Sequence, residues 1–237
     1  MNCSTIIAST ITGALTAPSP TVQNITAVGN QTYTPSAGVV RIRVRMCGGG
    51  GGGGGYTVAG TNGNPTYFGP AGTSRWAANA GLGAEGGIAE GYNGGDGGTG
   101  GQNASVGGNS LIVRIPGGKG QGYSVVNSFG GQGGANPFGG SGAGAGNRST
   151  HACGWPGATN TGAGGGGAAS NFAYTGPGGG AGEYVEFYVA GPLPATIACT
   201  IGDGGAGGYY IMIAPPYTEI CGGKGAAGII IIEEMYT

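Results

Sequence analysis

The sequence predicts an all-β protein whose interior is packed with glycine, and three observations carry this prediction. Glycine supplies 63 of the 237 residues, whereas an average protein contains about 7% glycine. Several short segments alternate apolar and polar residues with the period of two that characterises a half-buried strand. No apolar pattern with a helical period extends over more than two turns.

The composition indicates an ordered chain, although a high glycine content is also common in disordered proteins. Charged residues make up only 7% of the chain and hydrophobic residues 38%, with 12 tyrosines, 5 phenylalanines and 2 tryptophans. Collagen is excluded because no Gly-X-Y register is sustained. The net charge of −1 indicates no nucleic-acid partner, which would require a basic surface, and it favours self-association.

The alternation is clearest over residues 39–46, which read VVRIRVRM. The apolar residues of this segment share one face, and Arg41, Arg43 and Arg45 share the other, so the segment is predicted to be a half-buried strand. We interpret the arginine face as a solvated face of a sheet. A binding site for an anion or a sulfated glycan is the alternative.

Other segments with strand patterns follow along the chain, at residues 110–118, 183–191, 197–201 and 209–214. The last run, at residues 229–232, consists of isoleucine and is apolar on both faces. It is therefore predicted to be a central strand covered on both sides. Together these segments predict a β-sandwich-like meander.

Residues 48–55 are consecutive glycines. Ordering such a run costs more backbone entropy than ordering any other sequence, so the run is ordered only where neighbouring chains pack closely around it. Without Cβ atoms, extended polyproline-II-like segments can approach closely and bond through their backbones. We expect this packing because glycine-rich runs recur between the predicted strands. A flexible linker is the alternative.

The chain is expected to divide into an extended attachment and assembly arm at residues 1–31 and a glycine-rich β domain at residues 32–237. The arm is rich in Thr, Ser, Ile and Val and almost uncharged, a composition suited to pairing with a strand of a neighbouring subunit. A leader packed on its own domain is the alternative. The first residues also lack the basic region of a secretory signal peptide.

The five cysteines are odd in number and form no Cys-x-x-Cys pair, so no zinc site is expected. Cys47 and Cys199 lie in strand-like runs and are predicted to be small buried apolar residues. A disulfide among Cys153, Cys199 and Cys221 stays open.

No catalytic residue, cofactor or metal ion is expected. The single histidine, His151, has no aspartate in a triad-like context, because Asp96 and Asp203 both lie in Gly-Asp-Gly-Gly turns. Two such turns without a nonapeptide period do not indicate a calcium-binding repeat. A glycosidase would need a pair of carboxylates. The candidates in the chain are Glu85, Glu90 and Glu183.

Three segments in order resemble the glycine-rich C-terminal tip domain of phage tail-fibre and receptor-binding proteins. They are residues 33–55 (YTPSAGVVRIRVRMCGGGGGGGG), residues 178–208, and residues 222–234 (GGKGAAGIIIIEE). The resemblance implies a β framework with glycine-rich packing at the distal end of a fibre. It also implies a trimeric assembly that touches host surface glycans or outer-membrane proteins.

The short inserts between glycine runs carry aromatic residues, Asn and Ser, which is typical of recognition loops on a rigid frame. We predict that Arg75, Trp76, His151 and Trp155 contact the receptor, because tryptophan is enriched at binding hot spots. The alternative is that both tryptophans are buried anchors of their loops.

The expected function is that of a non-enzymatic structural and adhesive protein of the virion, at a tail-fibre tip that acts outside the cell. Its expected partners are other fibre or baseplate subunits, a host surface glycan or outer-membrane protein, and further copies of itself, with a trimer favoured. A self-polymerising extracellular fibril or pilus-like subunit, assembled through residues 1–31, is the alternative. A secreted glycan hydrolase is the third hypothesis.

Overall fold

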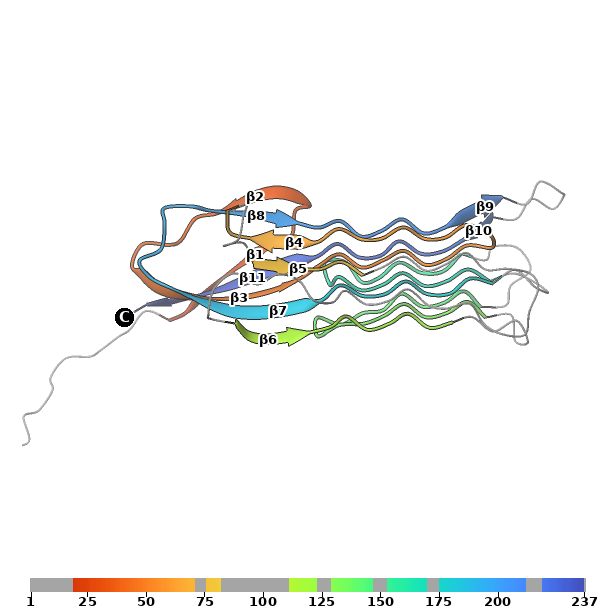
Figure 1. The fold of residues 1–237 in the computed structure, drawn as a ribbon, viewed down its shortest axis with the longest axis horizontal. Coiled ribbons are helices and arrows are strands. Elements are labelled where there is room, and N and C mark those ends of the chain that lie inside the picture. The colour runs from red at the N-terminus through yellow and green to blue at the C-terminus, as the bar shows by residue number, and fades with distance from the viewer. Residues whose placement is uncertain are drawn as a thin grey trace, which may run out of the picture.

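A computed structural model of the chain describes residues 19–70, 76–81, 111–122, 129–146, 153–169, 175–211 and 219–236. These ranges contain strands and no helix, which confirms the all-β prediction. Figure 1 shows an elongated molecule with a strand-built half and a half of long undulating segments. We call the first half the sandwich, which holds the described strands β1 to β8 and β11. The second half is the glycine lattice, which holds residues 48–64, 79–81, 116–122, 129–146, 153–169, 175–182, 202–208 and 222–228.

The strands of the described residues are β1 (Thr21–Ile25), β2 (Gly29–Tyr33), β3 (Val39–Cys47), β4 (Thr66–Phe68), β5 (Trp76–Ala78), β6 (Leu111–Ile115), β7 (Tyr184–Ala190), β8 (Ile197–Ile201), β9 (Tyr209–Ile211), β10 (Glu219–Cys221) and β11 (Ile229–Tyr236). One sheet has the order β1-β11-β3-β7-β6 and the other β2-β8-β4-β5, with every neighbouring pair antiparallel. The consecutive strands β7 and β8 belong to different sheets. The short β9 and β10 pair with each other at the far end of the lattice (Figure 1).

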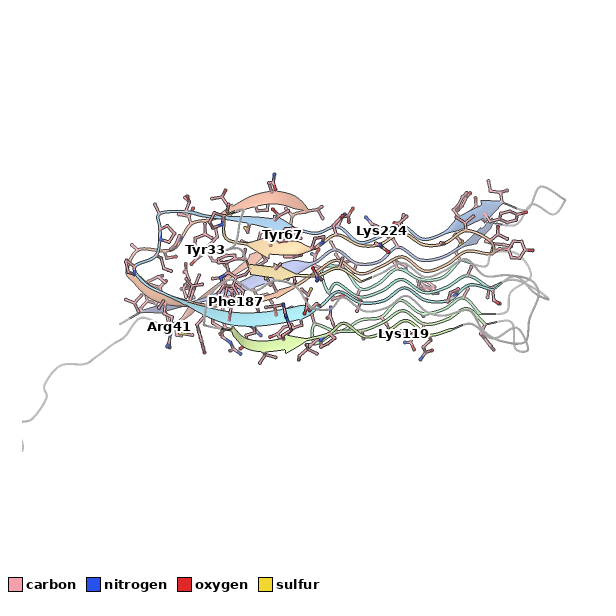
Figure 2. All side chains as sticks on the ribbon, in the orientation of Figure 1. Tyr33, Arg41, Tyr67, Lys119, Phe187 and Lys224 are labelled. Carbon is pink, nitrogen blue, oxygen red and sulfur yellow. A yellow bond between two sulfur atoms is a disulfide. The ribbon has the colours of Figure 1, made fainter. Side chains whose placement is uncertain are left out.

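The sandwich core lies between the two sheets. The predicted alternation in β3 is confirmed, because Ile42, Val44 and Met46 are fully buried while the arginines lie on the other face. Tyr33, Phe68 and Phe187 are packed within this core. Figure 2 labels Tyr33 and Phe187 in the strand-built half. The remaining buried members come from both sheets and include Trp76, Ala78, Val185, Ile197, Cys199, Ile201, Ile230 and Ile232.

The terminal strand β11 is central, as predicted, since it pairs with β1 on one side and β3 on the other. Its coverage is less complete than predicted. Ile230 and Ile232 are fully buried in the sandwich core, whereas Ile229 and Ile231 on the opposite face are only half-buried.

The expected boundary after residue 31 is wrong. That position lies inside β2, which pairs with β8, and β1 pairs with β11 of the same chain. Residues 19–31 therefore belong to the sandwich, because both segments supply strands to its sheets. Residues 1–18, the rest of the expected arm, lie outside the described residues.

The amides of residues 48–55 donate hydrogen bonds to three neighbouring segments in rotation, at 2.8–3.1 Å. The donor and acceptor pairs are Gly48–Glu183, Gly51–Gly180 and Gly54–Pro177 for the first segment, Gly49–Asn64, Gly52–Thr61 and Gly55–Val58 for the second, and Gly50–Ala226 and Gly53–Gly223 for the third. A partner therefore recurs every third residue, and three residues per turn is the repeat of a polyproline II helix. Along each segment the partner numbers fall as the donor numbers rise, so these neighbours are antiparallel.

The carbonyls of the same run accept hydrogen bonds from three further segments. The pairs are Gly165 with Gly51, Ala168 with Gly54, Gly205 with Gly50, Gly208 with Gly53, and Gly81 with Gly49, all at 2.8–3.0 Å. In the segments that contain residues 165–168 and 205–208, the donor numbers rise with the acceptor numbers. These two segments therefore run parallel to residues 48–55. The glycine run is thus the centre of a hexagonal array, with six neighbouring segments bonded to its backbone.

Around residues 48–55 this array leaves little room for side chains. A Cβ atom on Gly50 would overlap the carbonyl group of Ala163, and one on Gly52 would overlap that of Ala206. The prediction of close polyproline-II-like packing is confirmed, and the linker alternative is wrong. Glycine is required here because backbone atoms of one segment occupy the space that a side chain of the next would fill.

The outer segments of the lattice expose every third residue. In the segment that begins at Phe129, that residue, Gln132 and Ala135 are exposed, and the glycines between them are mostly buried. A helix of three residues per turn repeats the same outward direction about every 9 Å. The lattice surface therefore carries straight columns of side chains. Side chains of neighbouring columns can meet, as where Gln132 Nε2 donates to Ser141 Oγ at 2.8 Å.

Candidate interaction surface at the distal end of the lattice

The distal end is the end of the glycine lattice farther from the sandwich, where β9 and β10 lie (Figure 1). The hairpin of these strands is held by a small apolar cluster. Ile220 of β10 is fully buried with Ala168, and the rings of Tyr56 and Tyr210 meet edge to face at 5.3 Å. A packed cluster at this position fixes the ends of several lattice segments relative to one another.

A disulfide between Cys153 and Cys221 closes the same end. It joins two adjacent lattice segments, since the amide of Gly154 also donates to the carbonyl of Cys221 at 2.8 Å. The pairing that the sequence left open is therefore Cys153 with Cys221. Cys199 is a free, buried cysteine, and so is Cys47, as predicted.

The surroundings of Cys47 favour its protonated thiol. Its thiol is fully buried where β3 enters the lattice, and burial raises its pKa to about 12. The thiolate, which is the nucleophilic and metal-binding form, is therefore absent at neutral pH.

Large apolar side chains are exposed around the distal end. They are Val58, Phe129, Trp155, Tyr209 and Ile211. Each lies where a lattice segment ends or within one turn of that end, as the bonds from Gly55 to Val58 and from Gly130 to Ala145 indicate. We call these five residues the distal apolar set. Exposed apolar groups gathered in one region of a soluble protein mark an interaction surface more often than scattered ones do.

The structure separates the two tryptophans that were predicted to contact a receptor. Trp155 is 67% exposed and belongs to the distal apolar set. Trp76 is 8% exposed in the sandwich core, where its ring stacks on Phe187 with the centroids 4.0 Å apart and the planes within 5°. Trp76 is therefore a buried anchor, which was the alternative interpretation. Arg75 and His151 lie outside the described residues.

The arginine face of β3 is occupied by partners from its own sheet. Arg43 pairs with Glu186 at 2.7 Å and with Glu233 at 3.3 Å, and Arg45 pairs with Glu233 at 2.6 Å. These guanidinium groups are about one-third exposed. The cross-strand carboxylates neutralise the charge that an anion or a sulfated glycan would need, which favours the sheet-face interpretation.

The carboxylates considered for catalysis do not form an open pair in the described residues. Glu183 is fully buried, its Oε1 lies 2.9 Å from Arg114 Nε, and its Oε2 accepts from the amide of Asn79 at 3.2 Å. Asp203 pairs with Lys224 at 2.9 Å. Glu85, Glu90 and Asp96 lie outside the described residues.

The part of the chain that the structure describes contains no group of three or more side chains suited to binding a metal ion. Within that part no helix is long and apolar enough to cross a membrane. Comparisons with models of protein families, with curated proteins and with solved structures give no match to the chain.

The sequence interpretation missed four members of the distal apolar set, namely Val58, Phe129, Tyr209 and Ile211. A signal for them exists in the chain. Phe129 and Tyr209 adjoin a glycine run, and Val58 and Ile211 lie three residues after the last glycine of one. In a lattice of three-residue helices, such edges lie at the ends of the array, where side chains have room.

Proposed function

We propose that this protein is a non-enzymatic adhesive module at the tip of a phage tail fibre, and that its distal end contacts a host surface receptor. The receptor is a glycan or an outer-membrane protein. The observation that carries the proposal is the distal apolar set, presented at one end of a hydrogen-bonded lattice. The resemblance of residues 33–55, 178–208 and 222–234 to fibre-tip domains supplies the biological setting.

The lattice supports this function through its rigidity. Every amide of residues 48–55 is hydrogen-bonded to a neighbouring segment, so the central segment has no freedom to bend independently. A surface that is held in place before binding loses little conformational entropy when a receptor docks. An adhesive tip gains from this rigidity in two ways. The lattice resists mechanical load, and it holds the binding surface in place before the receptor docks.

The opposite half of the molecule supports attachment to other subunits. A second set of exposed apolar residues lies on the sandwich or where a strand leaves it, and consists of Val22, Val28, Val40 and Ile115. We propose that this half contacts further fibre or baseplate subunits, in an assembly with three copies of the chain. In this arrangement the two apolar sets serve different partners, one at the distal end and one along the sandwich.

The rival hypothesis of a self-polymerising fibril has lost part of its basis. It requires residues 1–31 to donate a strand to a neighbouring subunit. Residues 21–25 and 29–31 already pair with β11 and β8 of their own chain. Electron microscopy of the purified protein separates the two hypotheses, since the adhesive module forms discrete particles and the fibril forms open-ended filaments.

Adhesion is tested by binding of fluorescently labelled protein to a panel of Gram-negative cells. We expect saturable binding to at least one strain. The triple variant Phe129→Ser, Tyr209→Ser, Ile211→Ser should bind at least tenfold more weakly, because hot-spot side chains carry most of the binding energy. The matched control Val22→Ser changes an exposed apolar residue of the sandwich and should bind these cells normally. Absence of binding to every strain, or equal loss in the control, contradicts the proposal.

A further inference from the structure

We propose that the Cys153–Cys221 disulfide is a redox switch of the distal end, which small thiols such as glutathione open and close by thiol–disulfide exchange. In the oxidised state the bridge holds Trp155 in a fixed position relative to Tyr209. In the reduced state residues 153–155 detach from β10, while the rest of the lattice stays folded. The switch is a property of the fold, and only its effect on receptor binding rests on the proposed function.

The bridge connects two parts of the distal apolar set. Cys153 lies two residues before Trp155 on one lattice segment. Cys221 lies on β10, where it is the register partner of Tyr209 on β9, and Ile211 belongs to the same pair of strands. The disulfide is therefore the covalent connection between the segment that carries Trp155 and the strand that carries Tyr209 and Ile211.

The β10 side of the bridge is also anchored by other contacts. Ile220 is fully buried against Ala168, and Gly222 donates to the carbonyl of Gly208 at 2.8 Å. These contacts and the pairing of β9 with β10 hold Cys221 in place in either state of its sulfur. Reduction is therefore expected to leave β9 and β10 paired.

The other side, at residues 153–155, depends more strongly on the bridge. Its described backbone hydrogen bonds lie at 2.8–2.9 Å and run from Gly154 to Cys221, from Trp155 to Ala143 and from Gly166 to Trp155. Each such bond adds little net stability, because water replaces it when the segment opens. The side chain of Trp155 adds little packing, since it is 67% exposed. Without the covalent bond this end can open locally, as the ends of elements commonly do.

Small thiols can reach this bridge more easily than the buried cysteines. Cys153 and Cys221 are both half-buried, whereas Cys47 and Cys199 are buried and free. Burial raises the pKa of the Cys47 and Cys199 thiols, so neither supplies the thiolate that attacks a disulfide. Among these four cysteines, exchange is therefore directed to the bridge.

The closing reaction balances with glutathione disulfide as the oxidant. The thiolate of one cysteine attacks a sulfur of glutathione disulfide, which forms a mixed disulfide and releases one glutathione thiolate. The thiolate of the second cysteine then attacks the cysteine sulfur of the mixed disulfide, forms the bridge and releases the second glutathione. Two electrons pass from the two cysteines to glutathione disulfide, and the two protons they lose go to the released glutathiones.

The direction of the switch follows from the compartment. Thiols are kept reduced inside cells, and disulfides persist outside them. The switch is therefore open where the chain is made in a reducing interior, and it closes when the protein reaches an oxidising exterior. The distal end becomes fixed only in the second setting.

The test is amide hydrogen exchange of the intact protein, oxidised and after reduction with dithiothreitol. A Cys3→Ser background removes the cysteine that lies outside the described residues. We expect reduction to lower the protection of residues 153–157 at least about tenfold, as in a local opening. Residues 48–55 and 219–223 should stay protected in both states.

Two results of this measurement would overturn the proposal. Equal protection of residues 153–157 in both states would show that the bridge only restricts the unfolded chain. Exchange of residues 48–55 after reduction would show that the lattice opens as a whole. Mixtures of reduced and oxidised glutathione provide a third criterion, since a bridge that no mixture reduces is not a switch.

Variants assign the response to these two cysteines. The double variant Cys153→Ser, Cys221→Ser should exchange like the reduced protein and should not respond to dithiothreitol. The matched control Cys199→Ala changes a free, buried cysteine and should switch like the parent protein. A control that no longer responds to dithiothreitol would assign the response to Cys199 and overturn the proposal.

Cell binding tests the consequence for the receptor surface separately. The reduced protein should bind host cells at least about tenfold more weakly than the oxidised protein, because a surface that is not held in place pays an ordering cost on docking. Oxidised glutathione should restore binding. Equal binding in both states would show that the switch does not govern the receptor surface. Absence of binding in both states contradicts the proposed function and not the switch, because hydrogen exchange involves no receptor.

Discussion

At Gly52 a Cβ atom would overlap the carbonyl group of Ala206, whereas at Gly146 it would meet only the ring of Phe129, at 3.8 Å. The two glycines therefore make a matched pair for the variants Gly52→Ala and Gly146→Ala. We expect the first to lower stability by about 3 kcal/mol or more, since the obstructing atoms are backbone that other hydrogen bonds hold in place. The second should change stability by less than about 1 kcal/mol. Thermal melting followed by circular dichroism measures both, and equal melting temperatures would contradict the lattice packing.

Glu234 is a fully buried carboxylate that neutral groups stabilise. It accepts hydrogen bonds from the hydroxyl of Tyr33 at 2.7 Å, from the amide and hydroxyl of Ser36 at 2.9 and 2.7 Å, and from the hydroxyl of Thr21 at 2.5 Å. Burial opposes ionisation, but these hydrogen bonds outweigh it and hold the pKa of Glu234 at about 2. The ionised group thereby connects β1, β2 and the following turn to β11.

This carboxylate makes stability depend on pH. Its pKa in the folded protein is about 2, below the value of about 4.3 for an unfolded glutamate. The stabilisation is therefore complete above about pH 4.3 and is lost as the pH falls through about 2. We expect Glu234→Gln to cost on the order of 3 kcal/mol at pH 7 and progressively less as the pH falls toward 2.

The measurement is the difference in melting temperature between wild type and Glu234→Gln across this pH range. Glu233→Gln is the control, because Glu233 is the next residue on β11 and pairs with Arg43 and Arg45 at the partly exposed face. Such pairs contribute about 0–1 kcal/mol. A difference between wild type and Glu234→Gln that does not shrink at low pH would contradict the assignment.

Among the elements, the distal ends of two lattice segments are tied covalently by Cys153–Cys221, across a sequence separation of 68 residues. A disulfide that closes a loop of this length commonly contributes about 2–4 kcal/mol, because it restricts the unfolded chain. We expect the double variant Cys153→Ser, Cys221→Ser to melt at a lower temperature than wild type by the corresponding amount.

Reduction provides the internal control for this prediction. A thiol reductant should lower the melting temperature of wild type to that of the double variant and leave the double variant unchanged. A wild-type protein whose melting temperature is indifferent to the reductant would show that the bridge does not contribute. The buried Cys47 and Cys199 are free in both proteins, so they do not account for a difference.

On the scale of the whole molecule, the sandwich and the lattice are built from the same continuous segments. The strand β3 leads directly into residues 48–55, β8 leads into residues 202–208, and residues 222–228 lead into β11. Figure 1 shows these strands continuing along the long axis as lattice segments. Neither half can lose its structure without releasing the ends of the segments that form the other.

We therefore expect the whole molecule to unfold in a single transition. Fluorescence of the buried Trp76 reports on the sandwich, in a Trp155→Phe background that removes the exposed indole. Far-ultraviolet circular dichroism of the polyproline-II-like segments reports on the lattice. The two melting curves should coincide, which is the test of two-state behaviour. Two separated transitions would show that sandwich and lattice fold independently.

The sequence by itself determined the all-β class, the strands predicted at residues 39–46 and 183–191, and the close packing of the glycine runs. These features depend on local patterns, namely the period of two in a strand and the absence of Cβ atoms in residues 48–55. The burial of Cys47 and Cys199 was expected because free cysteine behaves as a small apolar residue in a strand-like run.

Only the tertiary structure decided which segments lie side by side. One glycine offers the same donor and acceptor as any other, so the run at residues 48–55 carries no side-chain code for its six neighbours. The partner of Cys221, the burial of Trp76 and the exposure of Trp155 depend on that arrangement. So does the membership of residues 21–31 in the sandwich, because their partners β11 and β8 lie more than 160 residues later in the chain.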